Sequence, residues 1–289
     1  VTYIDRYTHQ EKVVRGRYVV LSASAIETAR ILLNSKSSLF PNGLANSSGL
    51  VGRNLMEDTR GYVTGYLPQL EGREVTNEDS YGGSLLIHPF VNVDERTRSK
   101  DFLRRYLMYV SGGFTINPAS RGEMPPFGAE RKTTMRREYG SEFTITGAGC
   151  GLEDPNNFVD IDPEVKDAWG IPAIRIHLKF GPNQNAMIRN IVERGSEIVE
   201  SAGGKVINRS ASTNMPGGAI HEQGTCRMGD DPKKSVTNRW GQSHDVPNLI
   251  LADGSIHCTC GITNPTLTIL SLTMRNMSHL AEEVRKGGV

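Results

Sequence analysis

The segment VVLSASAIETARILLN, residues 19–34, decides the fold class. It begins with β-branched and apolar residues, and within AIETARILLN (25–34) the apolar residues recur at the spacing of one helix face. The segment therefore reads as a strand, a tight turn and a helix. Because a strand that turns directly into a helix is the repeating unit of a doubly wound α/β sheet, the sequence predicts an α/β layer near the start of the chain.

Further segments extend this layer. Residues 1–5 and 17–21 are rich in β-branched and aromatic residues, and we expect them to pair as two strands joined by a polar turn. Near the other end, NLILADGS (248–255) reads as a buried strand that ends in an Asp-Gly turn. A long helix follows over residues 265–286, with Pro265 in its first turn. The α/β layer therefore resumes at the end of the chain.

The middle of the chain has a different pattern. Between about residues 61 and 209, short alternating strands and many turns accompany one long helix, which we expect over residues 183–202. This pattern predicts a mostly antiparallel sheet with helices, inserted into the α/β part. We expect residues 1–60 and 214–289 to belong to one α/β domain and residues 61–213 to form an inserted domain, which is an α+β arrangement as a whole.

Composition excludes several classes of protein. The chain has 289 residues with 33 basic and 32 acidic side chains, so no excess of positive charge points to nucleic acid. No segment approaches the roughly 20 consecutive apolar residues that a membrane span needs. We therefore expect a soluble protein, and both the cytoplasm and the periplasm remain open as its compartment.

The four cysteines are too few for a disulfide framework. A metal site is an alternative, since His257, Cys258 and Cys260 are close in sequence and Cys226 could join them. The C-x-C spacing lacks the paired pattern of structural zinc sites, and buried free cysteines are common. We therefore expect no metal.

Three segments hold candidate functional residues. His221 opens HEQGTCRMG, and histidine is suited to acid or base catalysis, although an isolated histidine is more often a surface or core residue. Asn264 precedes Pro265 at the start of the last helix, where an ordinary N-cap is the simpler explanation. Asp253 and Gly254 follow a predicted strand, at the edge where ligands bind in α/β sheets but where a simple turn is equally expected.

Taken together, HEQGTCRMG (221–229), NLILADGS and NPTLTILSL (264–272) closely resemble the C-terminal signature of the glucose-methanol-choline (GMC) oxidoreductases. The resemblance is strongest to the branch of pyranose oxidases and glucoside 3-dehydrogenases. Upstream, VVLSASAIETARILLNSK and GLVGRNLMED (49–58) resemble earlier landmarks of the family. The resemblance implies the C-terminal part of a doubly wound FAD-binding domain, interrupted by a substrate-binding domain that is built on an antiparallel sheet.

The resemblance also implies roles for individual residues. His221 matches the family's catalytic base, and Asn264 matches the partner of that base. The positions that match the family's FAD contacts are Asp253 and Gly254 along the ribityl and phosphate region, Pro265 and Thr266 at the helix start under the flavin ring, and Ala23 and Ser24 after the early strand. The expected reaction is oxidation of a CH–OH group of a sugar, glucoside or related alcohol by hydride transfer to FAD.

Two departures from the family pattern stand out. The family usually has Ala-Gly-Ala where this chain has Ala23-Ser24-Ala25, and a side chain there alters a close backbone approach to the cofactor. The Gly-x-Gly-x-x-Gly turn that places the FAD pyrophosphate at a helix N-terminus is not in the sequence.

The start of the chain is consistent with the missing Gly-x-Gly-x-x-Gly turn. Its first residue, Val1, lies in a predicted strand, so we expect a C-terminal fragment that is inactive alone and whose partner is the missing N-terminal FAD-binding half. A non-catalytic fragment or paralogue that does not bind FAD is the alternative. The electron acceptor is open between oxygen, a quinone and a haem-containing acceptor protein.

Overall fold

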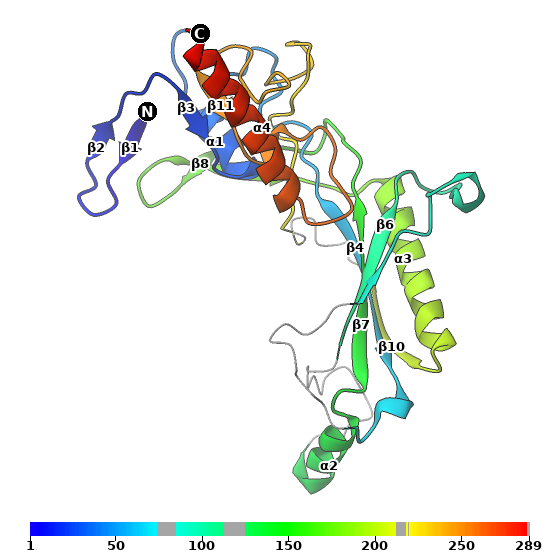
Figure 1. The fold of residues 1–289 in the computed structure, drawn as a ribbon. Helices are drawn as coiled ribbons and strands as arrows, with labels where there is room; N and C mark the ends of the chain where they lie inside the picture. Colours follow the sequence, from blue (N-terminus) through cyan, green and yellow to red (C-terminus); the bar gives the residue numbers. More distant parts are fainter. Residues whose placement is uncertain (74–84, 113–124, 126, 212–217, 219, 288–289) are drawn as a thin grey trace. The chain divides into compact units, whose positions relative to one another are not determined.

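The structure is a computed structural model that describes residues 1–73, 85–112, 125, 127–211, 218 and 220–287. The chain divides into two compact units (Figure 1). The first unit comprises Val1–Glu57, Gly151–Lys179 and Ala219–Val289, and the second comprises Asp58–Cys150 and Phe180–Gly218. We expected one uninterrupted inserted block, residues 61–213, but residues 151–179 belong to the first unit. The expected boundary at residue 213 lies among residues 212–217, outside the described part.

The first unit mixes helices and strands. Its elements are β1 (Thr2–Ile4), β2 (Glu11–Val13), β3 (Val19–Leu21), α1 (Ala25–Asn34), β8 (Phe158–Lys166), β9 (Pro172–His177), β11 (Leu249–Leu251), the 3-10 helix η3 (Gly254–Ile256) and α4 (Thr266–Arg285). β3 and β11 pair in parallel, with Val19 opposite Leu249 and Leu21 opposite Leu251. Segments from the two ends of the sequence therefore share one small parallel sheet.

The partner of the first strand differs from the expectation. β1 pairs in the antiparallel sense with β2, not with residues 17–21. The turn between β1 and β2 is closed by the Asp5 carboxylate, which accepts from the Thr8 amide at 2.9 Å and from Lys12 Nζ at 2.6 Å. β2 is polar and fully exposed, whereas β3 is apolar and gains more by pairing with β11, whose three residues are all buried.

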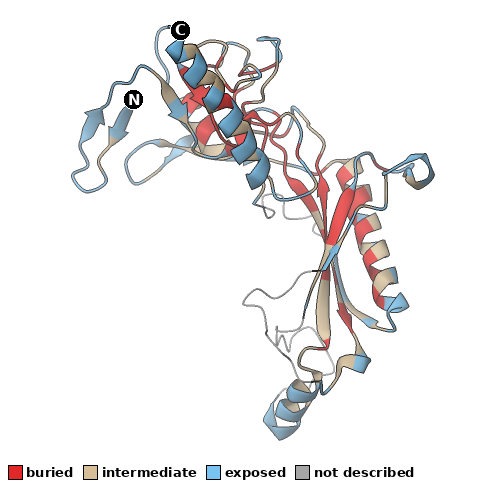
Figure 2. Cartoon of the chain, in the orientation of Figure 1, coloured by how far each residue is buried: buried red, intermediate tan, exposed pale blue. Residues whose placement is uncertain are grey.

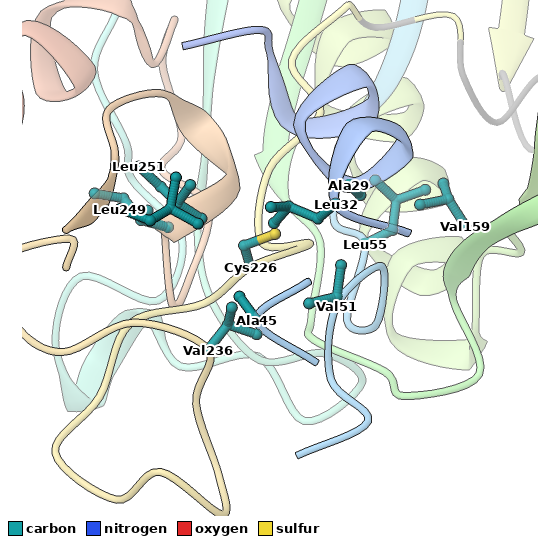
Figure 3. Packing of buried hydrophobic residues seen from close by; sticks show 11 residues of the cluster. Ala29, Leu32, Ala45, Val51, Leu55, Val159, Cys226, Val236, Leu249 and Leu251 are labelled. Atoms are coloured by element: carbon teal, nitrogen blue, oxygen red, sulfur yellow. The ribbon is translucent and has the colours of Figure 1, made fainter. Parts of the chain in front are cut away.

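A hydrophobic core connects the three segments of the first unit (Figure 3). α1 begins and ends where the sequence predicted, and its residues Ala29 and Leu32 are fully buried in this core. The other buried members are Ala45, Val51, Leu55, Val159, Cys226, Val236, Leu249, Leu251 and Ile256. Because burial of apolar surface is the main stabilising term in folding, this cluster holds the separate segments together.

The hairpin of β8 and β9 belongs to this core. Arg30 on α1 forms an ion pair of 2.8 Å with Asp167, which lies in the turn between the two strands. The Val159 amide donates to the Gly52 carbonyl at 2.8 Å. FVDID (158–162), which we expected in the inserted sheet, is therefore part of the first unit.

The second unit is an antiparallel sheet with a long helix on one face. Its elements are β4 (Asp58–Tyr66), η1 (Pro68–Leu70), β5 (Leu85–Ile87), η2 (Glu95–Thr97), β6 (Tyr106–Gly112), α2 (Gly128–Glu138), β7 (Glu142–Cys150), α3 (Pro182–Ser201) and β10 (Lys205–Ala211). The strand order is β10-β4-β7-β6-β5, with every pairing antiparallel. This confirms the antiparallel sheet predicted here, and α3 lies within one residue of its expected bounds. Within the described part, no helix has the length and apolar character needed to cross a membrane.

Glycines in the sheet let α3 pack closely against it. A Cβ atom on Gly147 would lie 2.3 Å from Ile191 Cγ2, and one on Gly149 would lie 2.2 Å from Met187 Sδ. Ile191 and Met187 are almost completely buried, and Figure 2 shows the buried stripe that runs along α3. The lack of a side chain at these two positions of β7 is therefore what allows the helix to bury its apolar face.

Candidate functional site

The segment HEQGTCRMG is fixed by main-chain hydrogen bonds on both of its sides. Gln223 exchanges two bonds of 2.9 Å with Met56, one from each main-chain amide to the other's carbonyl. On the other side, the Cys226 amide donates to the Ser255 carbonyl at 2.8 Å, directly after the end of β11. The segment is therefore fixed relative to the parallel strands, and His221 lies at its start.

The structure brings His221 and Asn264 together. Asn264 Nδ2 lies 3.2 Å from His221 Nε2. α4 begins at Thr266, its cap position is Pro265, and no side chain caps it. The expected simple role of Asn264 as an N-cap is therefore wrong, because its amide contacts the histidine and not the helix.

The expected cofactor positions after the two parallel strands are neighbours. Ala23 and Ser24 follow β3, and Asp253 and Gly254 follow β11. Thr28 links the two pairs, since its hydroxyl donates to Asp253 Oδ2 at 2.5 Å and accepts from the Ala23 amide at 3.2 Å. Four of the predicted residues therefore meet at the carboxyl ends of neighbouring strands, which is the edge where ligands bind in such sheets.

The start of α4 lies close to the same edge. A Cβ atom on Gly254 would lie 3.5 Å from Ile269 Cδ1 in the first turns of α4, and 3.2 Å from the Glu222 carbonyl. Pro265 and Thr266 open this helix, and Thr266 is exposed. The first unit therefore places the helix start and the histidine segment next to the turn after β11.

Ser24 keeps the backbone conformation of a glycine. Its φ is 81° and its ψ is 163°, a region that residues with side chains rarely occupy. The side chain still caps α1, because its oxygen accepts from the Glu27 amide at 3.4 Å. Ser24, at the position where the family usually has glycine, thus adopts a glycine-like conformation at a cost in strain.

We predict that Ser24→Gly raises the free energy of unfolding by about 1 kcal/mol. Relief of the strain, roughly 1–3 kcal/mol, exceeds the loss of the cap, a few tenths, and the entropy cost of a new glycine, about 0.5–1 kcal/mol. Urea unfolding followed by circular dichroism measures the change. Ser35→Gly is the matched control at the other end of α1, where φ is −82° and no strain is relieved. A Ser24→Gly protein less stable than the parent would contradict the strain argument.

Sequence reasoning missed two buried side chains, one within the histidine segment and one after η3. Gln223 and His257 are both buried, and His257 Nδ1 lies 2.5 Å from Gln223 Oε1. Burial lowers the pKa of His257, while the nearby Asp253 carboxylate opposes that shift. His257 was considered only as a metal ligand, because no local sequence pattern distinguishes a buried histidine that binds an amide from any other histidine.

The four cysteines, all of them in the described part of the chain, form no disulfide, and Cys258 and Cys260 bind different main-chain carbonyls. Cys258 Sγ donates to the Met228 carbonyl at 3.0 Å, whereas Cys260 Sγ donates to the Gly151 carbonyl at 3.2 Å. Burial raises the pKa of the Cys226 thiol to about 12, so this sulfur stays protonated. Among the residues that the structure describes, no three histidine, cysteine or acidic side chains come together as metal ligands.

Comparison with known proteins gives related oxidoreductases along almost the whole chain. This chain is 34% identical over 95% of its length to 2-methyl-1,2-propanediol dehydrogenase from Mycolicibacterium austroafricanum. It is 31% identical over 98% to 6'''-hydroxyparomomycin C oxidase from Streptomyces lividus, and 28% identical over 99% to the fructose dehydrogenase large subunit from Gluconobacter japonicus. It covers 49%, 49% and 51% of these proteins, so the chain spans about half the length of the curated relatives it matches.

A solved structure has the same fold. Pyridoxine 4-oxidase from Mesorbium loti superposes with a TM-score of 0.52 at 17% identity, over 97% of this chain and 54% of that one. Residues 154–273 match the family model described as GMC oxidoreductase. Residues 154–273 therefore correspond to the C-terminal domain of the GMC oxidoreductase family, and the similarity to oxidoreductases extends along nearly all of the chain.

Proposed function

We propose that this chain is the C-terminal part of an FAD-dependent oxidoreductase that oxidises a CH–OH group of a sugar, glucoside or related alcohol. The observation that carries the proposal is the 3.2 Å contact between His221 and Asn264, in the unit whose parallel strands β3 and β11 are followed by Ser24 and Asp253. The names of two relatives, a propanediol dehydrogenase and a fructose dehydrogenase subunit, support an alcohol or sugar as the substrate class.

The residues at the strand ends fit FAD. Ala23, Ser24, Asp253 and Gly254 would lie along the ribityl and phosphate region of the cofactor, beyond the carboxyl ends of β3 and β11. The first turn of α4 has no side-chain cap, so its amide N–H groups favour a negative charge. Pro265 and Thr266 would therefore lie under the flavin ring, where negative charge accumulates on reduction. We assign this unit to the C-terminal part of a doubly wound FAD-binding domain.

His221 would act as the base. In the observed orientation the Asn264 amide donates to Nε2 of His221, so this nitrogen is the unprotonated one. A substrate hydroxyl would replace the Asn264 amide at Nε2 and give its proton to this nitrogen, and the displaced Asn264 amide would donate to the same oxygen. FAD, when bound, supplies the acceptor for the hydride that leaves the carbinol carbon. The product is then the corresponding aldehyde or ketone.

The second unit is our candidate for the substrate-binding domain. Its strands come from segments inserted between parts of the first unit, as the family resemblance implies. Substrate selectivity would then depend on this unit, whereas proton removal would depend on His221 and Asn264.

An apolar stripe on α4 supports a further polypeptide segment as partner. Leu267, Leu270 and Met274 recur at helical spacing and are 75%, 56% and 72% exposed. Figure 2 shows how little of α4 is buried, and within the described residues only Asn276 of this helix is buried. Exposed apolar patches of this kind are typical of interaction surfaces. We assign the stripe to an N-terminal FAD-binding half, equivalent to the rest of the relatives' length, which would also supply the Gly-x-Gly-x-x-Gly turn.

The proposal is tested by supplying that half. The chain joined to its N-terminal FAD-binding half should bind flavin, and the flavin should lose its visible absorbance anaerobically when a suitable diol or sugar is added. Absence of bound flavin in the joined protein would favour the non-catalytic alternative.

Reoxidation of the reduced flavin by oxygen, a quinone or a haem protein would then identify the electron acceptor. The subunit name of the fructose dehydrogenase relative favours including an acceptor protein among these candidates.

A further inference from the structure

A chain of hydrogen bonds runs from the buried core to the main chain of His221. Gln223 and His257 are 1% and 5% exposed. His257 Nδ1 lies 2.5 Å from Gln223 Oε1, and Gln223 Nε2 donates to the His221 main-chain carbonyl at 3.2 Å. The Gln223 amide thus connects the buried imidazole to the residue that we propose as the base.

The chemistry of the groups fixes the direction of each bond. A main-chain carbonyl only accepts, so the NH2 group of Gln223 faces His221 and its oxygen faces His257. Nδ1 of His257 must therefore carry the proton, and Nε2 carries the lone pair. Since burial also lowers the pKa of His257, the ring stays neutral and keeps this tautomer.

The main chain at His221 lies between a strained residue and a fixed one. Ile220 has a φ of 57°, which is uncommon for a β-branched side chain. On the other side, Gln223 is held by its two main-chain bonds with Met56. A strained conformation persists when its surroundings over-determine it, and the bond from the Gln223 side chain to the His221 carbonyl is one such constraint.

We propose that Gln223, oriented by His257, is a positioning residue that holds the His221 imidazole against Asn264 for removal of the substrate's hydroxyl proton. The inference rests on the proposed role of His221 as the base. Gln223 and His257 act through the His221 main chain and do not contact the substrate. A neutral amide suits this position because it donates on one side and accepts on the other without adding charge next to the base.

The test uses the flavin-containing protein joined to its N-terminal half. Gln223→Leu removes both side-chain bonds at similar volume, and we expect the rate of flavin reduction to fall about 10- to 100-fold, because small displacements of a catalytic group have effects of this size. Substrate affinity should change by about twofold or less, because this bond acts on the base and not on binding. Thr237→Val is the matched control, since Thr237 is a fully buried polar residue of the same unit outside this chain of bonds.

Variants of His257 separate positioning from packing. His257→Leu leaves the Gln223 oxygen without a donor and should slow flavin reduction as Gln223→Leu does. His257→Asn places an amide donor near the position of Nδ1 and should restore most of the rate. If Gln223→Leu does not fold, the two His257 variants test the positioning role in its place. Equal rates of flavin reduction in His257→Leu and His257→Asn would overturn the proposal.

Nitrogen NMR of the histidine rings gives a measurement independent of turnover. We expect His257 as the Nδ1-protonated neutral tautomer in the parent protein, and an Nε2-protonated ring would overturn the proposal. Two variants distinguish the proposed function of His221 from the positioning role of Gln223. Normal flavin reduction in His221→Ala would remove the proposed function, whereas slow reduction in that variant with a normal rate in Gln223→Leu would remove only the positioning role.

Discussion

Replacing His221 with alanine should slow flavin reduction by about two to four orders of magnitude in the protein joined to its N-terminal half. Alanine leaves no group that accepts the hydroxyl proton, so the hydride would have to leave from a neutral alcohol. Asn264, which lies 3.2 Å from the imidazole, remains in place to bind the substrate oxygen. Substrate affinity should therefore change much less than the rate. Anaerobic stopped-flow measurement of flavin absorbance gives both quantities from the dependence of rate on substrate concentration.

An exposed histidine provides the control for this experiment. His9 lies in the turn between β1 and β2 with a φ of 56°, and asparagine tolerates that conformation well. His9→Asn should reduce flavin at the parental rate. A rate in His221→Ala within a few-fold of the parent would show that another group removes the proton.

Gly52→Ala should lower the free energy of unfolding by about 3–5 kcal/mol, combining left-handed strain with a steric clash. Gly52 has a φ of 86°, and an added Cβ would lie 2.3 Å from the Val159 carbonyl oxygen. The residue also joins two parts of the first unit, because its amide donates to the Thr225 carbonyl at 2.7 Å and its own carbonyl accepts from Val159. The clashing oxygen belongs to the main chain and is not a flexible side-chain end that could move aside. Urea unfolding measures the loss, with low yield of folded protein as the extreme result.

Gly49 separates the two contributions to this cost. It has a φ of 70°, but nothing lies within 4 Å of an added Cβ. Gly49→Ala should therefore carry only the conformational penalty, about 1–2 kcal/mol. Equal losses for the two variants would mean that backbone strain alone, and not the contact with Val159, sets the cost at Gly52.

Local periodicity predicted α1 and α3 well, although α2 (Gly128–Glu138) was not expected. The apolar spacing in residues 25–34 gave α1 with its observed bounds, and the pattern in 183–202 gave α3 to within one residue. These predictions succeeded because residues three and four positions apart in the sequence form one face of a helix. The buried strand in NLILADGS was recognised from a different local signal, its continuous apolar run.

Long-range partners could not be predicted in this way. β1 pairs with β2, and the segment 151–179 returns to the first unit through contacts such as the Arg30–Asp167 ion pair. No local pattern specifies which strand or helix a segment will meet. The candidate site had the same limit, since the His221 and Asn264 pairing was expected only from a family resemblance, and the bond between Gln223 and His257 was not expected at all.

The pairing of β3 with β11 also bears on how the chain folds as it is synthesised. Residues 19–21 leave the ribosome long before residues 249–251, so the parallel pair and the core around α1 cannot close until residues 249–251 have emerged. The strands of the second unit lie between these points in the sequence and are complete earlier. Closure over so long a loop is intrinsically slow. Until residues 249–251 emerge, the apolar face of α1, including Leu32, therefore has no native partner from β11, and the nascent chain is a candidate client for chaperones that hold exposed apolar helices.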